Sequence, residues 1–231
     1  MNINIENQEV ILQQNDILSL KNINENTSKK DIYSYIKRGL DVLISSIALV
    51  ILSPIFLILA ILIKIDSKGP VFFKHTRIGK NGTTFKMYKF RTMYDNAEDM
   101  IKEFTPEQMK EWKENYKLTN DPRITKMGKF LRKTSIDEIP QLINILKGDL
   151  SLIGPRPVIE EELEKYEENK EKFLSVKPGL TGYWAANGRS NTSYDERMKM
   201  ELYYVDNISF KLDVKIFLKT ILSVIKKEGA M

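Results

Sequence analysis

The stretch VLISSIALVILSPIFLILAILI, residues 42–63, contains no charged side chain, and it decides how the rest of the chain is arranged. A helix of about 22 residues would be roughly 33 Å long, enough to cross the hydrocarbon core of a bilayer, which is roughly 30 Å thick. Ser53 and Pro54 lie in the middle, where a proline removes a helix hydrogen bond and bends the axis. The stretch therefore predicts a membrane helix broken at Ser53-Pro54.

Basic residues flank this stretch on both sides: Lys37, Arg38, Lys64, Lys68 and Lys74. Because basic residues mark the cytoplasmic side of a membrane helix, two basic flanks give no orientation for a single span. A helix that bends back and leaves by the face it entered would keep both flanks in the cytoplasm. From the residues alone this re-entrant hairpin is favoured, but a kinked span and a buried helix of a soluble protein stay open.

The amino-acid composition excludes several kinds of catalytic and metal site. The 231 residues include no cysteine and one histidine, and the net charge is +5. Disulfides, thiolate nucleophiles, cysteine-ligated zinc and histidine-cluster metal sites are therefore excluded. The positive charge suits phosphate-bearing partners or anionic surfaces. We divide the chain into a mobile polar leader (1–30), a re-entrant membrane hairpin (31–66) and a cytosolic domain associated with the membrane interface (67–228).

Beyond the membrane element, the pattern predicts an α+β fold that is mostly helical. Two stretches rich in β-branched and aromatic residues flank Asn81-Gly82, a strong signal for a β-hairpin turn. We expect SLIGPRPV, residues 151–158, to be irregular because it holds two prolines. Helices are predicted over 95–117, 141–148, 159–174 and 193–206. An amphipathic helix over 210–227 either packs on the domain core or lies at the membrane interface.

Two adjacent carboxylates occur in TSIDEIPQ, residues 134–141. In one interpretation Ser135 and Glu138 form a capping box at a helix start. In the other, Pro140 is the first helical residue, where its missing N–H costs nothing, and Asp137 and Glu138 precede the helix near its positive end. We favour the second interpretation, because an interior proline would disrupt the first turn.

Cations surround this pair in the sequence: Lys126, Lys129, Arg132 and Lys133 precede it, and Arg156 follows between two prolines. Lys89 and Arg91 close the predicted hairpin. Two carboxylates among several cations suggest phosphoryl chemistry, which depends on positioning and charge neutralisation. The chain has no Walker A, dinucleotide-binding or kinase motif. The alternative is a positive surface that faces solvent or lipid.

Long motifs in a fixed order resemble the monotopic phosphoglycosyl transferases, also called bacterial sugar transferases. They cover roughly residues 35–225: KRGLDVLISSIALVILSP, RIGKNGTTFKMYKFRTM, DPRITKMGKFLRKTSIDEIPQLINILKGDLSLIGPRP, KPGLTGYW, NGRSNTSYDER and YYVDNISFKLDVKIFLKT. The family often has Gln-Val where this chain has Ala185-Ala186, which puts details of sugar or nucleotide contact in doubt. Many larger relatives add N-terminal transmembrane helices, so this chain resembles the minimal catalytic form.

The resemblance implies transfer of a sugar-1-phosphate from a UDP-sugar to undecaprenyl phosphate, with release of UMP, at the start of capsule, exopolysaccharide or other glycan synthesis. Asp137 matches the family's nucleophile, which would form a covalent phosphosugar–aspartate. Glu138 matches the neighbouring acidic residue, which helps to hold Mg²⁺ together with Asp137. The matching substrate-binding residues are Arg132, Arg156, Arg189 and, more weakly, Lys89 and Arg91. Ser53-Pro54 matches the family's re-entrant break, and Lys37-Arg38 would anchor it at the headgroups.

The implied location is the cytoplasmic face of the bacterial inner membrane. The expected partners are the UDP-sugar, undecaprenyl phosphate and membrane lipids, but not nucleic acid. A second copy of the chain and downstream glycosyltransferases are further candidates. The rival hypotheses are a membrane-tethered basic binding module without catalysis and a different phosphotransferase, such as a lipid phosphatase. Asp137-Glu138 argues against the binding module, because acidic groups weaken the binding of anions.

Overall fold

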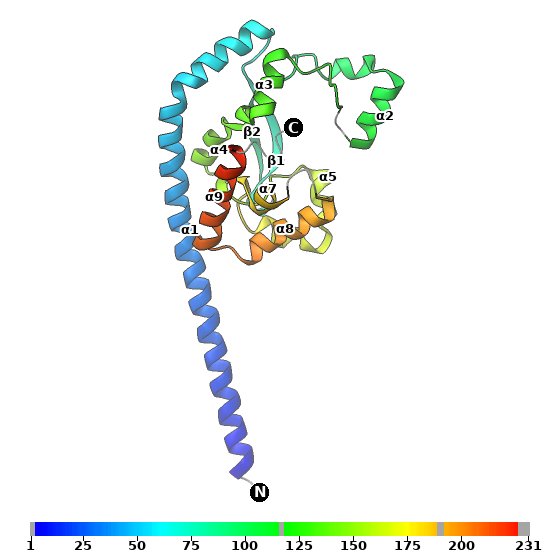
Figure 1. The fold of residues 1–231 in the computed structure, drawn as a ribbon. Coiled ribbons are helices and arrows are strands. Elements are labelled where there is room, and N and C mark those ends of the chain that lie inside the picture. The colour runs from blue at the N-terminus through cyan, green and yellow to red at the C-terminus, as the bar shows by residue number, and fades with distance from the viewer. Residues whose placement is uncertain (1–2, 116–117, 189–191, 226–231) are drawn as a thin grey trace.

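The computed structural model describes residues 3–115, 118–188 and 192–225, and Figure 1 shows a long N-terminal helix beside a small mixed domain. Helix α1 runs from Ile3 to Asp66. The segment predicted as a polar leader is therefore helical from Ile3, and no break separates it from the apolar stretch. Residues 1–30 contain no glycine or proline that would end a helix there. The mobility of this segment stays a prediction.

Pro54 lies inside α1, and the helix continues on both sides of it. Figure 1 shows the helix bending in its cyan part. Because Pro54 has no N–H, the carbonyl of Val50 loses its usual helical donor. The hydroxyl of Ser53 donates to that carbonyl at 2.8 Å and replaces the lost bond. The predicted break at Ser53-Pro54 is therefore corrected to a bend within one continuous helix.

Strands β1 (Phe72–Ile78) and β2 (Thr84–Phe90) form the predicted antiparallel hairpin. Asn81 and Gly82 in its turn have φ angles of 56° and 76°, the left-handed region that asparagine and glycine enter most readily. A second, parallel pair joins β3 (Ser151–Ile153) to β4 (Gly179–Thr181). Residues 151–158 were expected to be irregular, but a three-residue strand fits before the first proline.

The helices of the domain are short. They are α2 (Pro106–Asn115), α3 (Lys126–Thr134), α4 (Gln141–Lys147), α5 (Glu160–Leu163), α6 (Lys170–Leu174), α7 (Tyr183–Asn187), α8 (Tyr194–Asp206) and α9 (Phe210–Ile225). The helices predicted over 141–148, 193–206 and 210–227 are confirmed within a few residues. The helix predicted over 159–174 is divided, because Glu167 has a φ of 45°, outside the helical region. In the predicted helix over 95–117, of which 116–117 lie outside the described residues, only Pro106–Asn115 is α-helical, and a 3₁₀ turn, Asp99–Glu103, precedes it.

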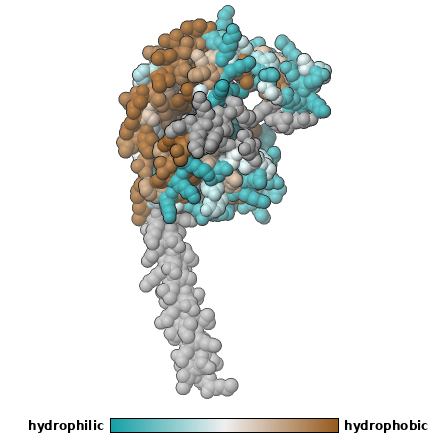
Figure 2. Space-filling view, viewed as in Figure 1, coloured by the Kyte–Doolittle hydropathy of each residue, from teal (hydrophilic) through white to brown (hydrophobic). Residues whose placement is uncertain are grey.

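One side of α1 packs on the domain, and the other side is exposed. Leu59 and Ile63 are buried in a cluster with Phe90 and Leu131, which joins the end of α1 to β2 and α3. The opposite side presents large apolar residues, such as Val50, which is 73% exposed. Figure 2 shows hydrophobic side chains gathered along the α1 side of the molecule. The stretch Ile32–Asp66 is long and apolar enough to cross a membrane.

Helix α9 packs on the domain core with one side and exposes apolar residues on the other. Ile216 on one side is buried in a cluster with Ile153 and Tyr204. The other side exposes a row of apolar residues: Phe210, Val214, Phe217, Leu218, Ile221 and Leu222. The helix thus packs on the core and also presents an apolar face suited to a membrane interface.

Candidate active site

The two carboxylates lie in one 3₁₀ turn, Ile136–Glu138, between α3 and α4. The turn starts at Ser135, which ends α3 in the left-handed region with a φ of 56°. The Ser135 side chain makes no capping bond to the turn, so the capping-box interpretation is wrong. Helix α4 begins at Gln141, directly after Pro140. Asp137 and Glu138 therefore precede the helix as predicted. Pro140 was expected to be the first helical residue, but it is the residue just before the helix.

Lys89 on β2 is the cation nearest to the pair. Its ammonium donates a hydrogen bond to Glu138 Oε1 at 2.6 Å and lies 4.0 Å from Asp137 Oδ2. The Asp137 side chain is 12% exposed, whereas that of Glu138 is 35% exposed. One carboxylate is thus nearly enclosed, and the other remains open to a ligand.

The surroundings push the pKa values of the two acids apart. Burial raises the pKa of Asp137 to about 6, helped by the charge of Glu138 and opposed by Lys89 and Arg132. Burial also disfavours the charge on Glu138, but the charge and hydrogen bond of Lys89, together with the charges of Arg156 and Arg77, outweigh it and hold the pKa of Glu138 below its usual value. At neutral pH both acids are ionised, and Asp137 is the more basic carboxylate.

Arg132 reaches the site from α3. Its Nε donates to the hydroxyl of Thr92 at 2.9 Å, and its charge lowers the pKa of Asp137. Gly128, one turn earlier on α3, lies against the backbone of Thr92, so closely that an added Cβ would meet the Thr92 carbonyl oxygen at 2.0 Å. This close approach of α3 to Thr92 fixes where the Arg132 side chain begins.

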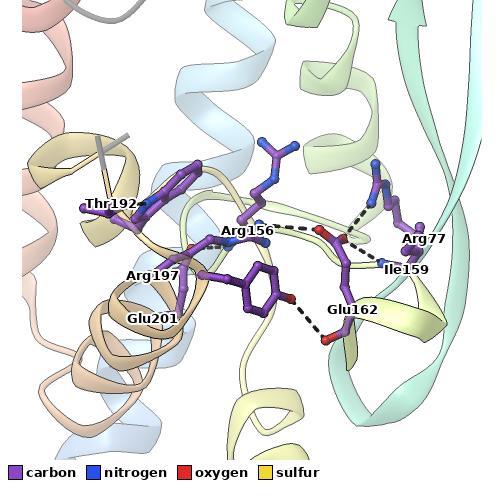
Figure 3. Close-up of polar contacts among 9 residues, drawn as sticks. Arg77, Arg156, Ile159, Glu162, Thr192, Arg197 and Glu201 are labelled. Atoms are coloured by element: carbon purple, nitrogen blue, oxygen red, sulfur yellow. Dashed lines mark hydrogen bonds and ion pairs between the residues drawn. The ribbon is translucent and has the colours of Figure 1, made fainter. Parts of the chain in front are cut away.

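Arg156 is a further cation whose charge acts on Glu138. Its backbone N–H donates to the buried carboxylate of Glu201 at 3.1 Å, while its guanidinium lies 5.8 Å from the Trp184 ring centroid. Figure 3 shows the Arg156 guanidinium pointing away from the Glu162 and Glu201 carboxylates. Its charge helps to lower the pKa of Glu138. The loop thus holds the backbone of Arg156 and leaves its head group available.

Arg77 on β1 is a site residue that the sequence analysis missed. Its charge also lowers the pKa of Glu138, and its Nη1 contacts Glu162 at 3.2 Å (Figure 3). Glu162 also contacts Arg197 at 3.4 Å. The hairpin register offered a signal, because residues 73, 75 and 77 share a face with their partners 89, 87 and 85. That pairing puts Arg77 on the same face as Lys89.

Arg91 does not lie among the candidate substrate ligands. It is 5% exposed, and its guanidinium donates to the carbonyls of Ile63, Ser67 and Lys68 at the end of α1. The carbonyls of Ser67 and Lys68 lie just beyond the end of the helix, where no further helical N–H follows to pair with them, whereas the Ile63 carbonyl also accepts from the Ser67 N–H at 3.2 Å. The prediction that Arg91 binds substrate is therefore corrected: Arg91 fastens the end of the apolar helix to β2.

Lys37 and Arg38 were expected at the lipid headgroups, but both bind the domain. Lys37 pairs with Asp213 on α9, which also accepts from Tyr33 at 2.5 Å. Arg38 donates to the carbonyls of Ile145 and Leu146 at 2.5 and 2.8 Å. The sequence could not show these contacts, because a basic residue that flanks a membrane helix can bind either a lipid phosphate or the carbonyls at the end of another helix. Arg189 lies outside the described residues.

A family model described as bacterial sugar transferase matches residues 32–227. The chain belongs to this family. The matched range includes the apolar part of α1, the carboxylate pair and every described residue of the candidate site. The family resemblance drawn from the sequence motifs is confirmed.

Three relatives illustrate the similarity. The chain is 46% identical over 197 residues to the exopolysaccharide production protein ExoY of Sinorhizobium fredii, covering 84% of this chain and 87% of that protein. It is 41% identical over 214 residues to the undecaprenyl-phosphate galactose phosphotransferase of Salmonella typhimurium, covering 91% and 44%. It is 40% identical over 206 residues to the UDP-N-acetylgalactosamine-undecaprenyl-phosphate N-acetylgalactosaminephosphotransferase of Aeromonas hydrophila, covering 86% and 46%. The chain thus spans less than half of the last two proteins.

Proposed function

We propose that this protein transfers a sugar-1-phosphate from a UDP-sugar to undecaprenyl phosphate and releases UMP. The observation that carries the proposal is the nearly enclosed Asp137 carboxylate, which lies beside Lys89 and within the field of Arg132. Two relatives are named as phosphotransferases acting on undecaprenyl phosphate. Since their names give different sugars, we make no choice among UDP-sugars.

In the first step, Asp137 Oδ would attack the phosphorus that carries the sugar. The new Asp137 Oδ–P bond forms as the P–O bond to UMP breaks, and UMP leaves as an anion. In the second step, an oxygen of the polyprenyl phosphate attacks the same phosphorus, and the bond to Asp137 breaks. The raised pKa of Asp137 fits this role, because a more basic carboxylate is a better nucleophile and is still ionised at pH 7.

The cations would neutralise the charge that the two phosphate substrates bring. Lys89 contacts both carboxylates, the charge of Arg132 acts on Asp137, and the charges of Arg156 and Arg77 act on Glu138. Such fixed charges stabilise a phosphoryl transition state without reorganising during the reaction. A basic module that only binds anions would have no use for two carboxylates at the centre of this cluster.

The carboxylate pair fits a magnesium ion. Mg²⁺ commonly takes one or two carboxylates and completes its shell with water and substrate phosphates. Glu138 is partly open, and within the described residues its Oε2 makes no hydrogen bond or ion pair. Glu138 and Asp137 would hold the ion, which would supply charge neutralisation on the diphosphate.

We further propose that α1 enters and leaves the membrane by the cytoplasmic face. The apolar stretch is fastened to the same domain at both ends. Asp41 at its start accepts from the Leu152 N–H at 2.9 Å, and Asp66 at its end accepts from the Met127 N–H at 3.0 Å. A straight span would carry one end to the opposite side of the bilayer, away from the domain. These contacts, and the bend at Pro54, support the re-entrant path.

The activity is tested by screening UDP-sugars for UMP release with polyprenyl phosphate and Mg²⁺. We expect one or a few UDP-sugars to support release, and Asp137→Asn to abolish it. The matched control is Asp206→Asn, because Asp206 is 52% exposed and its ion pair with Lys172 lies on the surface of the domain. Full activity of Asp137→Asn, or no release from any UDP-sugar by the unmodified protein, would contradict the proposal.

The path of α1 is tested by cysteine labelling, since the chain has no cysteine of its own. Single cysteines at positions 10 and 229 should both react with an impermeant reagent only from the cytoplasmic side. Labelling of the two positions from opposite sides would show a span.

A further inference from the structure

Asn144 joins the hairpin to the helix that follows the carboxylate pair, and its side chain is completely buried. Its Oδ1 accepts from the backbone N–H of Tyr88 at 2.9 Å, and its Nδ2 donates to the backbone carbonyl of Lys86 at 2.8 Å. The amide therefore binds the edge of β2 as a neighbouring strand would. The same Nδ2 contacts Asp149 at 3.1 Å, which fixes the orientation of the amide.

This edge needs a partner. Within residues 3–115, 118–188 and 192–225 the sheet of β1 and β2 has two strands, so one edge of β2 has no strand beside it there. Buried backbone groups without partners cost free energy, and one asparagine amide can supply both the acceptor and the donor. The other hydrogen bond that the described residues make between β2 and α4 joins Lys147 to the Tyr88 hydroxyl, and it is exposed. The buried hydrogen bonds of Asn144 thus fix the position of β2 along α4.

The position of β2 along α4 controls the geometry of the candidate site. Lys89 directly follows Tyr88 on β2, and Ile139 and Pro140 join the turn that carries Asp137 and Glu138 to the start of α4. A slip of β2 along α4 would change the 2.6 Å contact of Lys89 with Glu138 and its 4.0 Å approach to Asp137. We propose that Asn144 is a positioning residue that holds Lys89 at the carboxylate pair. This inference rests on the proposed function for its kinetic consequence.

A purely structural role for Asn144 makes a different prediction. Loss of stability would lower the amount of folded enzyme, whatever residue stands at position 89. A positioning role acts through Lys89, so removing Lys89 first should remove most of the effect of Asn144. A double-mutant cycle separates the two cases.

The experiment compares kcat and KM for UMP release among the unmodified protein, Asn144→Ala, Lys89→Met and the double variant. Measurements are made well below each variant's unfolding temperature. We expect Asn144→Ala to lower kcat about tenfold, as a coupling of about 1.4 kcal/mol would, with KM for the UDP-sugar within about twofold. In the Lys89→Met background the same substitution should lower kcat less than about twofold. The control is Asn207→Ala, because Asn207 donates to a carbonyl at the exposed end of α8.

If Asn144→Ala does not fold, Asn144→Ser takes its place in the cycle. Its hydroxyl is too short to bond both the Tyr88 N–H and the Lys86 carbonyl, and it adds no charge beside Asp149. Equal losses from the Asn144 substitution in both backgrounds, or a loss confined to KM, would overturn the positioning role. That result with an active unmodified protein leaves the proposed function intact, whereas an unmodified protein that releases no UMP refutes the function itself.

Discussion

Removal of the Lys89 ammonium should move the pH at which the enzyme becomes active. Burial holds the pKa of Asp137 at about 6, and Lys89 keeps it from rising further. Two unit charges 4.0 Å apart interact by about 1 kcal/mol in water and by about 4 kcal/mol near a protein surface. At about 1.36 kcal/mol per pKa unit, this brackets a shift of roughly 0.7 to 3 units.

We expect a shift near the lower end of that range, to a pKa of about 7. The Lys89 side chain is 24% exposed, so water screens part of its charge, and Glu138 holds the same ammonium at a shorter distance. In the proposed mechanism the ionised Asp137 carboxylate is the nucleophile, so the acid limb of the rate profile should move from about pH 6 to about pH 7 in Lys89→Met. The ionised fraction at pH 6 would fall about fivefold, whereas above about pH 8 the two proteins would be equally ionised.

The assay is kcat/KM for UMP release between pH 5 and 9 at one fixed Mg²⁺ concentration. Loss of a phosphate-binding charge would lower the rate equally at every pH, so the position of the limb isolates the effect on Asp137. Lys86→Met is the matched control, because Lys86 lies on the same strand and bonds the exposed Thr76 hydroxyl. An unmoved limb in Lys89→Met, or an equal movement in Lys86→Met, would refute this reasoning.

Three further substitutions test other parts of the site. Asp137→Asn should stabilise the fold by up to about 3 kcal/mol at pH 7. The pKa of Asp137 is raised by folding, so its ionisation lowers the free energy of unfolding as the pH rises, and asparagine removes that loss. Thermal unfolding should show the gain at pH 7 and no gain near pH 4. Gly128→Ala should destabilise the protein by several kcal/mol, roughly the cost of severe overpacking, and should lower activity through Arg132; an unchanged melting temperature would contradict the packing described. Arg91→Leu should cost roughly 3 kcal/mol of stability, because it leaves backbone carbonyls unpaired, and it should leave KM for the UDP-sugar unchanged. A raised KM with normal stability would show instead that Arg91 binds substrate.

The sequence predicted those features that depend on local chemistry. The uncharged stretch predicted the apolar helix, Pro54 marked the place where the structure has a bend and not the predicted break, and Asn81-Gly82 predicted the hairpin turn. The position of Pro140 predicted that Asp137 and Glu138 precede a helix. Each of these follows from properties of one or two residues that tertiary contacts do not override.

The features that the sequence missed depend on which groups meet across the fold. Arg91 was predicted to bind substrate and Arg38 to lie at the lipid headgroups, yet the guanidinium groups of both donate to backbone carbonyls at the ends of helices. Arg77 became a site residue only through the hairpin register and Glu162. The β3–β4 pair joins segments almost 30 residues apart, and three-residue strands carry little periodicity of their own.

The most direct test of the account is intact-mass measurement of the protein after incubation with its UDP-sugar and Mg²⁺ in the absence of polyprenyl phosphate. We predict one added sugar phosphate, mapped to Asp137 by peptide sequencing, with a matching amount of UMP released. The adduct should disappear when polyprenyl phosphate is added, and it should be absent from Asp137→Asn. Release of UMP only when both substrates are present, with no adduct on the protein, would contradict the covalent role of Asp137.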